Sequence, residues 1–389
     1  MWTRIRFDIG WGDLAAGIVY CVFPFRRRSA LLQARRAWSG REDFLITLSA
    51  RSSFDLFLRA LRLPEGSEIL FSAITVPDMV RIAEAHGLVA VPVDTDKHGC
   101  LCLRSLKQRL SPQSRILVVA HLFGGYRQMD DVYGEVGSRD LLVVEDCAQQ
   151  LRTVGQVGDS RSDLILYSFG PIKTSTALAG GVVTVCSPAL RQQMAEILEQ
   201  DPVQSRWRYG KRIVRFTLLK SLSGRFATRI LRFLLNVCGR DFDSIANSLG
   251  RSFLSTSLVL ELRRQPSGPL LRLLKRRWRN FDGSRIERRV ALGRFLDRRI
   301  GIQRQPEHSY WVYPLFVKNP SEVRQRMLKA GFDATCRTRM AVVRATHETG
   351  DTRTASWCWD HVVILPWYPE LPFQEVDRMA RILNDLERE

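Results

Sequence analysis

The feature that most limits the fold of this chain is an alternation of short apolar runs with helical patterns between residues 40 and 190. The runs are rich in Val, Ile and Leu, and they lack the apolar–polar alternation of a half-exposed strand. Strands that are buried on both faces have this composition, so the pattern predicts an α/β fold with a mainly parallel sheet covered by helices. The expected strands are SEILFSAIT, LVAVPVD, RILVVAHLFG, DLLVVED, LILYSFG and GGVVTV, and the expected helices between them are VPDMVRIAEAHG and LRSLKQRL.

Beyond residue 300 the pattern predicts a smaller α+β domain. HSYWVYPLFV and HVVILPW are typical of strands, PSEVRQRMLKAGF is typical of a helix, and a closing helix is expected from Pro372. The chain therefore divides into four parts. We expect an N-terminal arm able to lie at an interface (1–40), a large α/β domain (41–200), a basic amphipathic helical segment with a linker (201–282) and a small C-terminal α+β domain (283–389).

Lys173 is the only charged residue between Asp163 and Arg191, and its neighbours in YSFGPIKTST are aromatic, small or hydroxylic. An amine in dry, hydroxyl-lined surroundings can lose its proton and attack a carbonyl carbon. The alternative is a lysine whose stem packs on apolar surface while its ammonium group stays in water. Ligands bind at the carboxyl ends of parallel strands. The predicted strands place Ser168 there with Lys173, together with Thr75, His121 and Asp146.

Asp146, in VVEDCAQQL, ends a predicted buried strand, and Gln149 follows one helical turn later. A lone aspartate at this place can simply cap the next helix. A buried carboxylate can instead keep a pyridine nitrogen protonated, and Gln149 can reach the phenolic oxygen of the same ring. With an isolated lysine 27 positions after the aspartate, pyridoxal 5′-phosphate (PLP) is the economical explanation. His121 has only its strand-end location in favour of catalysis, and the alternative for it is a packing role.

Several motifs, in the right order from about residue 40 onward, resemble the DegT/DnrJ/EryC1/StrS sugar aminotransferases. They are SARSSFDLFLRAL, EGSEILFSAITVPDMV, VVAHLFGGYRQMD, VVEDCAQQ, YSFGPIKT and HVVILPWYPEL. The resemblance implies the PLP-dependent transferase fold type I, a homodimer and transfer of an amino group. It also implies that Lys173 forms the Schiff base with PLP, Asp146 pairs with the ring nitrogen, Gln149 contacts the phenolic oxygen and Ser168 contacts the phosphate.

The resemblance further implies that the backbone amides of Arg51 and Ser52, at a helix start, complete the phosphate site. Arg51 replaces a threonine of the family, so its guanidinium either adds a charge to the phosphate or points away. Val76 stands where relatives have an aromatic residue stacked on the cofactor ring. The substrate half of the site departs further: residues 178–181 read LAGG in place of Gly-Glu-Gly-Gly, and the nearest candidate for the nucleotide-sugar segment is NSLGRSF, with Asn247 and Arg251.

A formal net charge of +19 on 389 residues implies attraction to something anionic. Residues 204–240 hold ten Lys or Arg and no Asp or Glu, interleaved with Ile, Leu and Phe at helical spacing. We expect this segment to bind an anionic lipid surface or a lipid-phosphate substrate, with LAAGIVYCVFPFRRR near the N-terminus as a second contact. The alternative is a helical hairpin packed on protein with its arginines in solvent. The apolar run 14–25 is too short to span a bilayer.

The eight cysteines lack regular pairing and no metal-ligand spacing is present, so the sequence predicts reduced cytoplasmic thiols and no metal site. No nucleic-acid-binding motif accompanies the positive charge, so nucleic acid is not an expected partner. We expect a cytoplasmic protein, peripheral on the inner face of the membrane.

The predicted function is a PLP-dependent aminotransferase that moves an amino group from an amino acid, expected to be glutamate, to a keto group. The acceptor is expected to be an anionic small molecule with a sugar or lipid attached. Two alternatives stay open. The same lysine and aspartate support dehydration or carbon–carbon chemistry, and a PLP-binding, membrane-associated sensor without catalysis would retain the fold.

Overall fold

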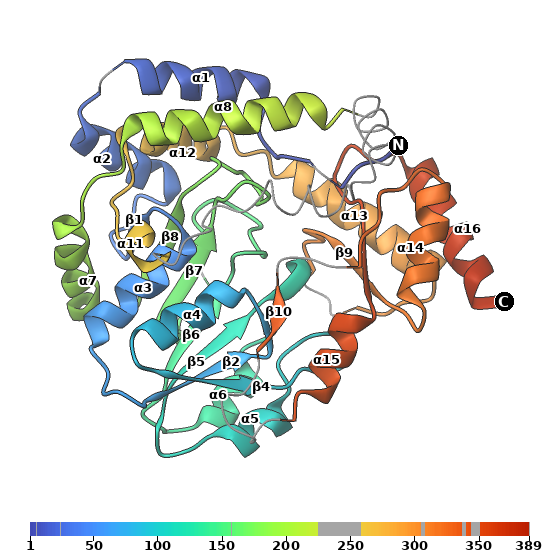
Figure 1. Cartoon of the computed structure of the whole chain (residues 1–389), viewed down its shortest axis with the longest axis horizontal. Helices are drawn as coiled ribbons and strands as arrows, with labels where there is room; N and C mark the ends of the chain where they lie inside the picture. The colour runs from blue at the N-terminus through green and yellow to red at the C-terminus, as the bar shows by residue number, and fades with distance from the viewer. Residues whose placement is uncertain are drawn as a thin grey trace.

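The structure is a computed structural model that describes residues 1–388 except 5, 24, 157, 225–257, 305–307, 337–339 and 344–350. Its centre is a seven-stranded sheet in the order β1–β8–β7–β6–β5–β2–β4 (Figure 1). The strands are β1 Phe44–Thr47, β2 Glu68–Ser72, β4 Val89–Val93, β5 Ser114–Ala120, β6 Leu142–Asp146, β7 Leu164–Ser168 and β8 Gly181–Val185.

The sheet is mainly parallel, as predicted. β2 pairs in parallel with β4 and β5, and β5, β6 and β7 continue the parallel set. β8 runs antiparallel to both of its neighbours, β7 and β1. A parallel return would need a long crossover, usually a helix, whereas the loop 169–180 contains none, so β8 comes straight back along β7. This loop carries Lys173.

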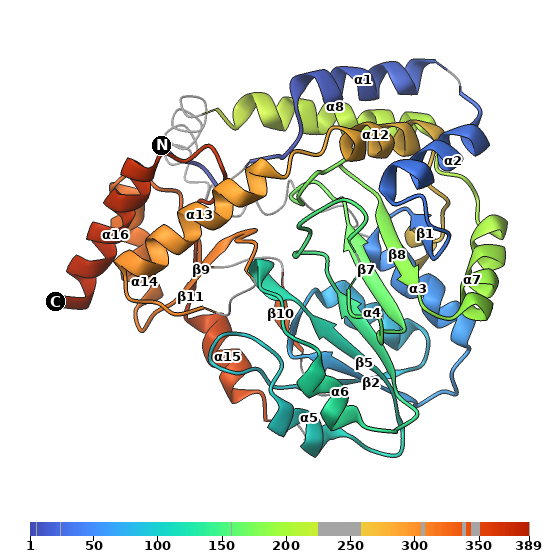
Figure 2. The ribbon, with the colours of Figure 1, turned by 180° about the vertical axis from the view of Figure 1, so that it is seen from behind.

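Helices cover both faces of the sheet, as the uniform apolar runs require (Figure 2). One face packs against α3 (Ala50–Leu61), α4 (Pro77–Ala85) and α7 (Pro188–Gln200). The opposite face packs against α5 (Leu103–Arg109), α6 (Asp130–Val136), α2 (Arg27–Trp38) and α12 (Gly268–Arg279). The short helix α11 (Leu258–Leu262) contacts α3.

Two further helices, α1 (Trp11–Val22) and α8 (Arg206–Leu222), lie side by side as an outer layer beyond α12 (Figures 1 and 2). A glycine in α1 favours the close approach, because a Cβ on Gly17 would lie 3.0 Å from Ile213 of α8. Buried side chains of α1, α8 and α12 share one apolar cluster with Tyr167 of β7. The N-terminal arm and the described part of the basic segment thus pack on the large domain; residues 225–240 of that segment lie outside the described residues.

The C-terminal part forms the expected smaller α+β unit. Its two-stranded antiparallel sheet of β9 and β11 packs with three helices, α13, α14 and α16, around a separate apolar cluster. β10 (Ala341–Val342) crosses to the large domain and pairs with β3 (Ile74–Thr75). The remaining elements are α13 Ser284–Arg299, β9 Tyr313–Phe316, α14 Pro320–Lys329, α15 Arg353–Asp360, β11 Val362–Leu365 and α16 Phe373–Arg388.

Among the helices that the structure describes, none combines the length and the apolar character needed to cross a bilayer. The described cysteines are all free thiols.

Candidate active site

A cavity of about 2230 Å³ gathers most of the residues that the sequence singles out. It lies where β6 and β7 end and α3 and α4 begin, and α8, α12 and α13 form its other walls. The predicted site residues on its lining are Arg51, Val76, Asp146, Gln149, Ser168 and Lys173. The individual roles given to these residues stay predictions, and their common location gives those roles a physical basis. Asn247 and Arg251 lie outside the described residues.

Asp146 is the last residue of β6, and its Oδ1 accepts a hydrogen bond of 3.0 Å from the backbone N–H of Ala148. Burial raises the pKa of Asp146, although that N–H and the positive charge of Lys173 act in the opposite direction. A carboxyl that is largely shielded from water in this way gains most from a cation placed directly against it. The protonated nitrogen of a pyridine ring is such a cation.

Gln149 is buried, with its amide held in a fixed orientation. Its Oε1 accepts a 2.7 Å hydrogen bond from the backbone N–H of Phe123, while its Nε2 points at the sulfur of Met340, 3.1 Å away. A thioether is a weak acceptor, so the amide nitrogen keeps the capacity to donate to a better oxygen in the cavity. This arrangement suits the phenolic oxygen of a pyridoxal ring.

Lys173 lies under an aromatic ring from the smaller domain. Its Nζ is 4.3 Å from the centre of the Trp311 ring, and Trp311 Nε1 donates to the carbonyl of Ile172 over 3.1 Å. Gly124 allows the backbone of Trp311 to approach this closely. Its φ of +101° favours glycine, and a Cβ there would lie 2.5 Å from the backbone nitrogen of Trp311. Trp311 is a site residue that the sequence analysis missed. Trp311 is far from Lys173 in the chain, and the sequence of its predicted strand does not indicate which part of the protein that strand faces.

Parts of the chain that depart from the family motifs hold the lysine loop from outside. Tyr209 Oη of α8 donates to the carbonyl of Ala177 over 2.7 Å, and Arg277 Nε of α12 donates to that of Thr176 over 3.1 Å. The N-terminal segment contributes Asp8, whose carboxylate accepts the N–H of Ser175 over 2.6 Å. The loop needs such support because Ser175 has a φ of +54°, a strained value for a residue with a side chain.

The start of α3 has the geometry of an anion site, with its first turn on the cavity. Ser49 caps the helix by accepting the N–H of Ser52 over 3.1 Å, so this amide already has a partner. Ser168 Oγ is 3.5 Å from the nearest N–H, that of Gly170, and is therefore almost uncommitted. The Arg51 guanidinium forms an ion pair with Asp78 at the start of α4, so at least part of its charge is directed away from the helix start.

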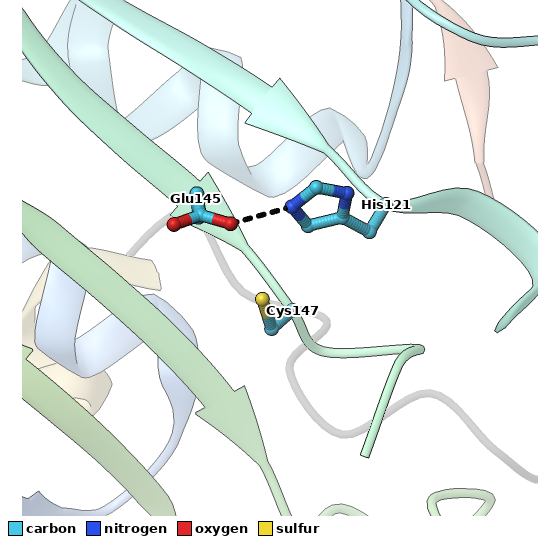
Figure 3. A group of neighbouring side chains, drawn as sticks. All are labelled: His121, Glu145 and Cys147. Carbon is cyan, nitrogen blue, oxygen red and sulfur yellow. Dashed lines mark hydrogen bonds and ion pairs between the residues drawn. The ribbon is translucent and has the colours of Figure 1, made fainter. Parts of the chain in front are cut away.

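His121, Glu145 and Cys147 form a buried group beside this site (Figure 3). His121 Nε2 is 2.9 Å from Glu145 Oε2, and His121 Nδ1 accepts the N–H of Arg127 over 3.2 Å. Ser162 Oγ donates to the other oxygen of Glu145 over 2.6 Å. Burial raises the pKa of the Cys147 thiol well above its usual value, and the nearby carboxylates of Glu145 and Asp146 act in the same direction. His121 is absent from the cavity lining, so its location supports the packing role.

One cavity, at the ends of β6 and β7, is thus lined by the carboxyl of Asp146, the amide of Gln149, Lys173 on its loop and the start of α3. The sheet behind it is covered by helices on both faces. These residues fit a phosphorylated pyridine aldehyde, and the fold is that of the PLP-dependent transferases of fold type I. Residues 29–216 match the model of the DegT/DnrJ/EryC1/StrS aminotransferase family, the family that the motifs of this chain resemble.

Curated relatives match over shorter stretches. GDP-perosamine synthase from Escherichia coli O157:H7 is 28% identical over 131 residues, which are 33% of this chain and 36% of that protein. A putative L-glutamine:3-amino-2,3-dideoxy-scyllo-inosose aminotransferase from Micromonospora echinospora is 25% identical over 181 residues, 44% of this chain and 42% of that protein. The chain thus matches well under half the length of each.

Solved structures share the fold over nearly the whole chain. A sugar aminotransferase from Micromonospora echinospora has a TM-score of 0.68 at 17% identity and covers 99% of this chain and 100% of its own. The E. coli GDP-4-keto-6-deoxy-D-mannose-3-dehydratase with bound hydrated PLP has a TM-score of 0.70 at 13% identity and covers 98% of this chain and 99% of its own. The fold therefore occurs with both aminotransferase and dehydratase activities.

Proposed function

We propose that this protein is a PLP-dependent aminotransferase that moves an amino group from an amino acid, with glutamate as the expected donor, to a keto group of an anionic acceptor. The observation that carries the proposal is the joint presence of Lys173, Asp146, Gln149 and Ser168 on the lining of one cavity. A scaffold without catalysis would need none of these groups together. The named aminotransferase relatives support the same reaction class.

Each residue has a defined task in this proposal. Lys173 Nζ would hold the cofactor at its aldehyde carbon, and once the donor amine has displaced it, the same Nζ would take the proton from the donor α-carbon and deliver it to that cofactor carbon. Asp146 holds the proton on the ring nitrogen, and Gln149 donates to the phenolic oxygen. Ser168 and the first turn of α3 bind the phosphate. When bound, PLP supplies the electron sink for the carbon from which the proton leaves.

The acceptor is proposed to carry phosphate or another anion, with a sugar or lipid attached. Basic side chains dominate the walls of the cavity away from the cofactor residues, and the exposed Lys211 and Arg215 of α8 lie among them. Cations in a confined cavity raise the local concentration of an anionic substrate. We also propose that the protein works as a cytoplasmic homodimer, which the family resemblance and the free thiols support.

Dehydration is the second candidate reaction, because the dehydratase structures have the same fold. One experiment tests the donor half of amino transfer, which the proposal requires. The purified protein is incubated with glutamate, and the release of 2-oxoglutarate and the passage of bound PLP to its amino form are followed by absorbance and mass spectrometry. Aminotransfer predicts one equivalent of each before any acceptor is added. A cofactor that stays in its aldehyde form with a panel of amino acids would contradict the proposal.

The attachment point is tested separately by borohydride reduction of the holoenzyme followed by peptide mapping. The proposal expects the reduced cofactor on Lys173, and it expects Lys173→Ala to lose both the adduct and the visible absorbance band. A reduced adduct on another lysine would contradict the assignment.

A further inference from the structure

The outer sides of α1 and α8 expose large apolar side chains on the protein surface. Trp11 and Phe23, at the two ends of α1, are 54% and 57% exposed, and Trp207 and Leu218 of α8 are 55% and 62% exposed. Ile18, Val19 and Val22 continue the stripe on α1, and Val214 continues it on α8. We call these eight residues the α1–α8 face. Helical spacing places the exposed residues of each helix along one side of it, and large groups of exposed apolar side chains commonly mark an interaction surface.

The charges around this face are predominantly positive. Asp13 is the only acid of α1, and it is turned inward, where it forms ion pairs with Arg276 and Arg277 of α12. α8 contains no acid, and its exposed basic residues Arg208, Lys211 and Arg215 stand beside the apolar stripe. Beyond the end of α1, Arg26 and Arg28 are also exposed. Glu261 pairs with Arg208, which leaves the positive character of the face intact.

This pattern decides between two occupants. A second copy of the chain, related by a two-fold axis through the face, would place the basic residues of α8 near the same residues of its mate, and like charges oppose such a contact. A bilayer with anionic headgroups complements both properties, because apolar side chains enter the headgroup boundary while Lys and Arg contact the phosphates. We propose that the α1–α8 face binds the surface of an anionic membrane.

The face is continuous with the proposed active site through α8. Lys211 and Arg215 are exposed beside the stripe and also line the cavity, as do Phe216 and Leu219 on the inner side of the helix. A membrane-bound protein would therefore present one wall of its cavity to the lipid headgroups. This defines the acceptor class as an anionic headgroup on a lipid. That last step depends on the proposed function, whereas membrane binding itself does not.

The test is co-sedimentation of the full-length protein with vesicles of phosphatidylglycerol and phosphatidylcholine, compared with phosphatidylcholine alone. Binding is expected on the anionic vesicles, and it should weaken at physiological salt because the headgroup charges are screened. The variant Ile18→Glu/Val22→Glu removes two apolar contacts from residues that are outside the cavity lining, and should lower the apparent vesicle affinity at least about tenfold. Leu32→Glu on α2 is the matched control, because Leu32 is equally exposed but not part of the face, and it should bind like wild type.

Three outcomes would overturn the inference. They are no binding to anionic vesicles at low salt, equal loss in the Leu32→Glu control, and dissociation of a wild-type dimer by Ile18→Glu/Val22→Glu, which would assign the face to a second copy. The glutamate reaction is measured on the same samples. Vesicle binding without amino transfer would refute the proposed function alone, and amino transfer without vesicle binding would refute this inference alone.

Discussion

At the scale of single residues, the carboxyl of Asp146 can serve as a helix cap, as a partner for a pyridine nitrogen, or as both. The N–H of Ala148 satisfies one oxygen, as in a simple cap, but burial still raises the pKa of the carboxyl. The group is therefore poorly stabilised as an anion by the protein alone. A protonated pyridine nitrogen supplies the missing positive charge, so the same geometry that makes a weak cap makes a good cofactor partner.

Replacing Asp146 by Asn should leave the fold intact, because the amide oxygen keeps the bond from Ala148 and the volume is unchanged. The reaction with glutamate should slow by about two to four orders of magnitude, because an amide cannot hold the ring proton. Stopped-flow absorbance after mixing with glutamate measures this. An Asn variant with bound PLP and the wild-type rate would show that Asp146 is only a helix cap.

His121 is expected to act on stability and not on chemistry. Its side chain and that of Glu145 are fully buried against each other, so His121→Ala leaves a buried carboxylate short of one hydrogen bond. We expect the free energy of unfolding to fall by about 2–4 kcal/mol, measured by urea denaturation. The pH dependence of the glutamate reaction should keep its wild-type shape in the surviving folded protein. If His121→Ala changed the pH profile and left the free energy of unfolding unchanged, His121 would have a catalytic role instead.

The sequence predicted four cofactor residues from short motifs at strand ends, and the structure places them on one cavity, while their roles stay predictions. Asp146, Gln149, Ser168 and Lys173 are fixed by the strands that precede them, and the positions of those strands follow from apolar runs. Trp311 and the ion pair of Arg51 with Asp78 depend on contacts between distant elements. Local patterns do not contain that information.

At the scale of elements, β8 and α3 meet at a point without room for a side chain. A Cβ on Gly181, the first residue of β8, would lie 2.5 Å from the carbonyl carbon of Ser49 and 2.6 Å from the nitrogen of Ala50. These are the cap and the first residue of α3, the helix whose start is proposed to bind phosphate. The glycine therefore sets how closely the helix start approaches the sheet edge.

Gly181→Ala should push the start of α3 out of place and weaken PLP binding at least about tenfold, with a loss of about 1–3 kcal/mol in the free energy of unfolding. Fluorescence titration of the apoprotein with PLP measures the first effect. Gly134→Ala is the control, because Gly134 lies within α6 with no atom within 4 Å of a Cβ there, and it should stabilise the protein by about 0.5–1 kcal/mol. Wild-type PLP affinity in Gly181→Ala would refute the role given to this contact.

The sequence predicted where most strands lie, but it did not predict the direction and the neighbours of every strand. The run GGVVTV gave β8, yet a buried strand has the same composition in either direction, so its antiparallel pairing depends on the absence of a crossover helix. β1 was missed because FLIT is too short to stand out beside the longer runs. The basic segment was predicted as an amphipathic helix, and what a helix packs against is decided by the rest of the fold.

At the scale of the whole molecule, Asp13 joins the outer helical layer to α12 through Arg276 and Arg277. Burial on its own raises the pKa of Asp13, but the charge of Arg277 and hydrogen bonds from Arg276 and Gly10 outweigh it, so the pKa lies below its ordinary value. The unfolded chain then binds the proton more readily than the folded one. The stabilisation is complete above the unfolded pKa and is lost as the pH falls through the folded pKa.

Asp13→Asn is expected to lower the free energy of unfolding by about 1–2 kcal/mol at pH 7, because Arg277 and the more exposed Arg276 lose their charged acceptor. The difference from wild type should shrink as the pH falls through the lowered pKa of the folded protein, because the wild-type carboxyl then becomes protonated as well. Urea denaturation at a series of pH values measures both. Asp140→Asn, at an exposed position, is the control, and a pH-independent difference for Asp13→Asn would contradict the linkage.

The first residues of the chain act as a strap between the two halves of the molecule. Trp2 bonds through its N–H to the carbonyl of Gly331, and Arg4 pairs with Asp333 over 2.7 Å, both in the smaller domain. A few residues later Asp8 holds the lysine loop at Ser175. The smaller domain also supplies the Trp311 ring above Lys173, so a hinge motion that opened the cleft would have to stretch this strap or break its end contacts. Ligand exchange is therefore expected to proceed with the two domains held at a nearly constant angle, through movement of side chains and loops at the cavity mouth.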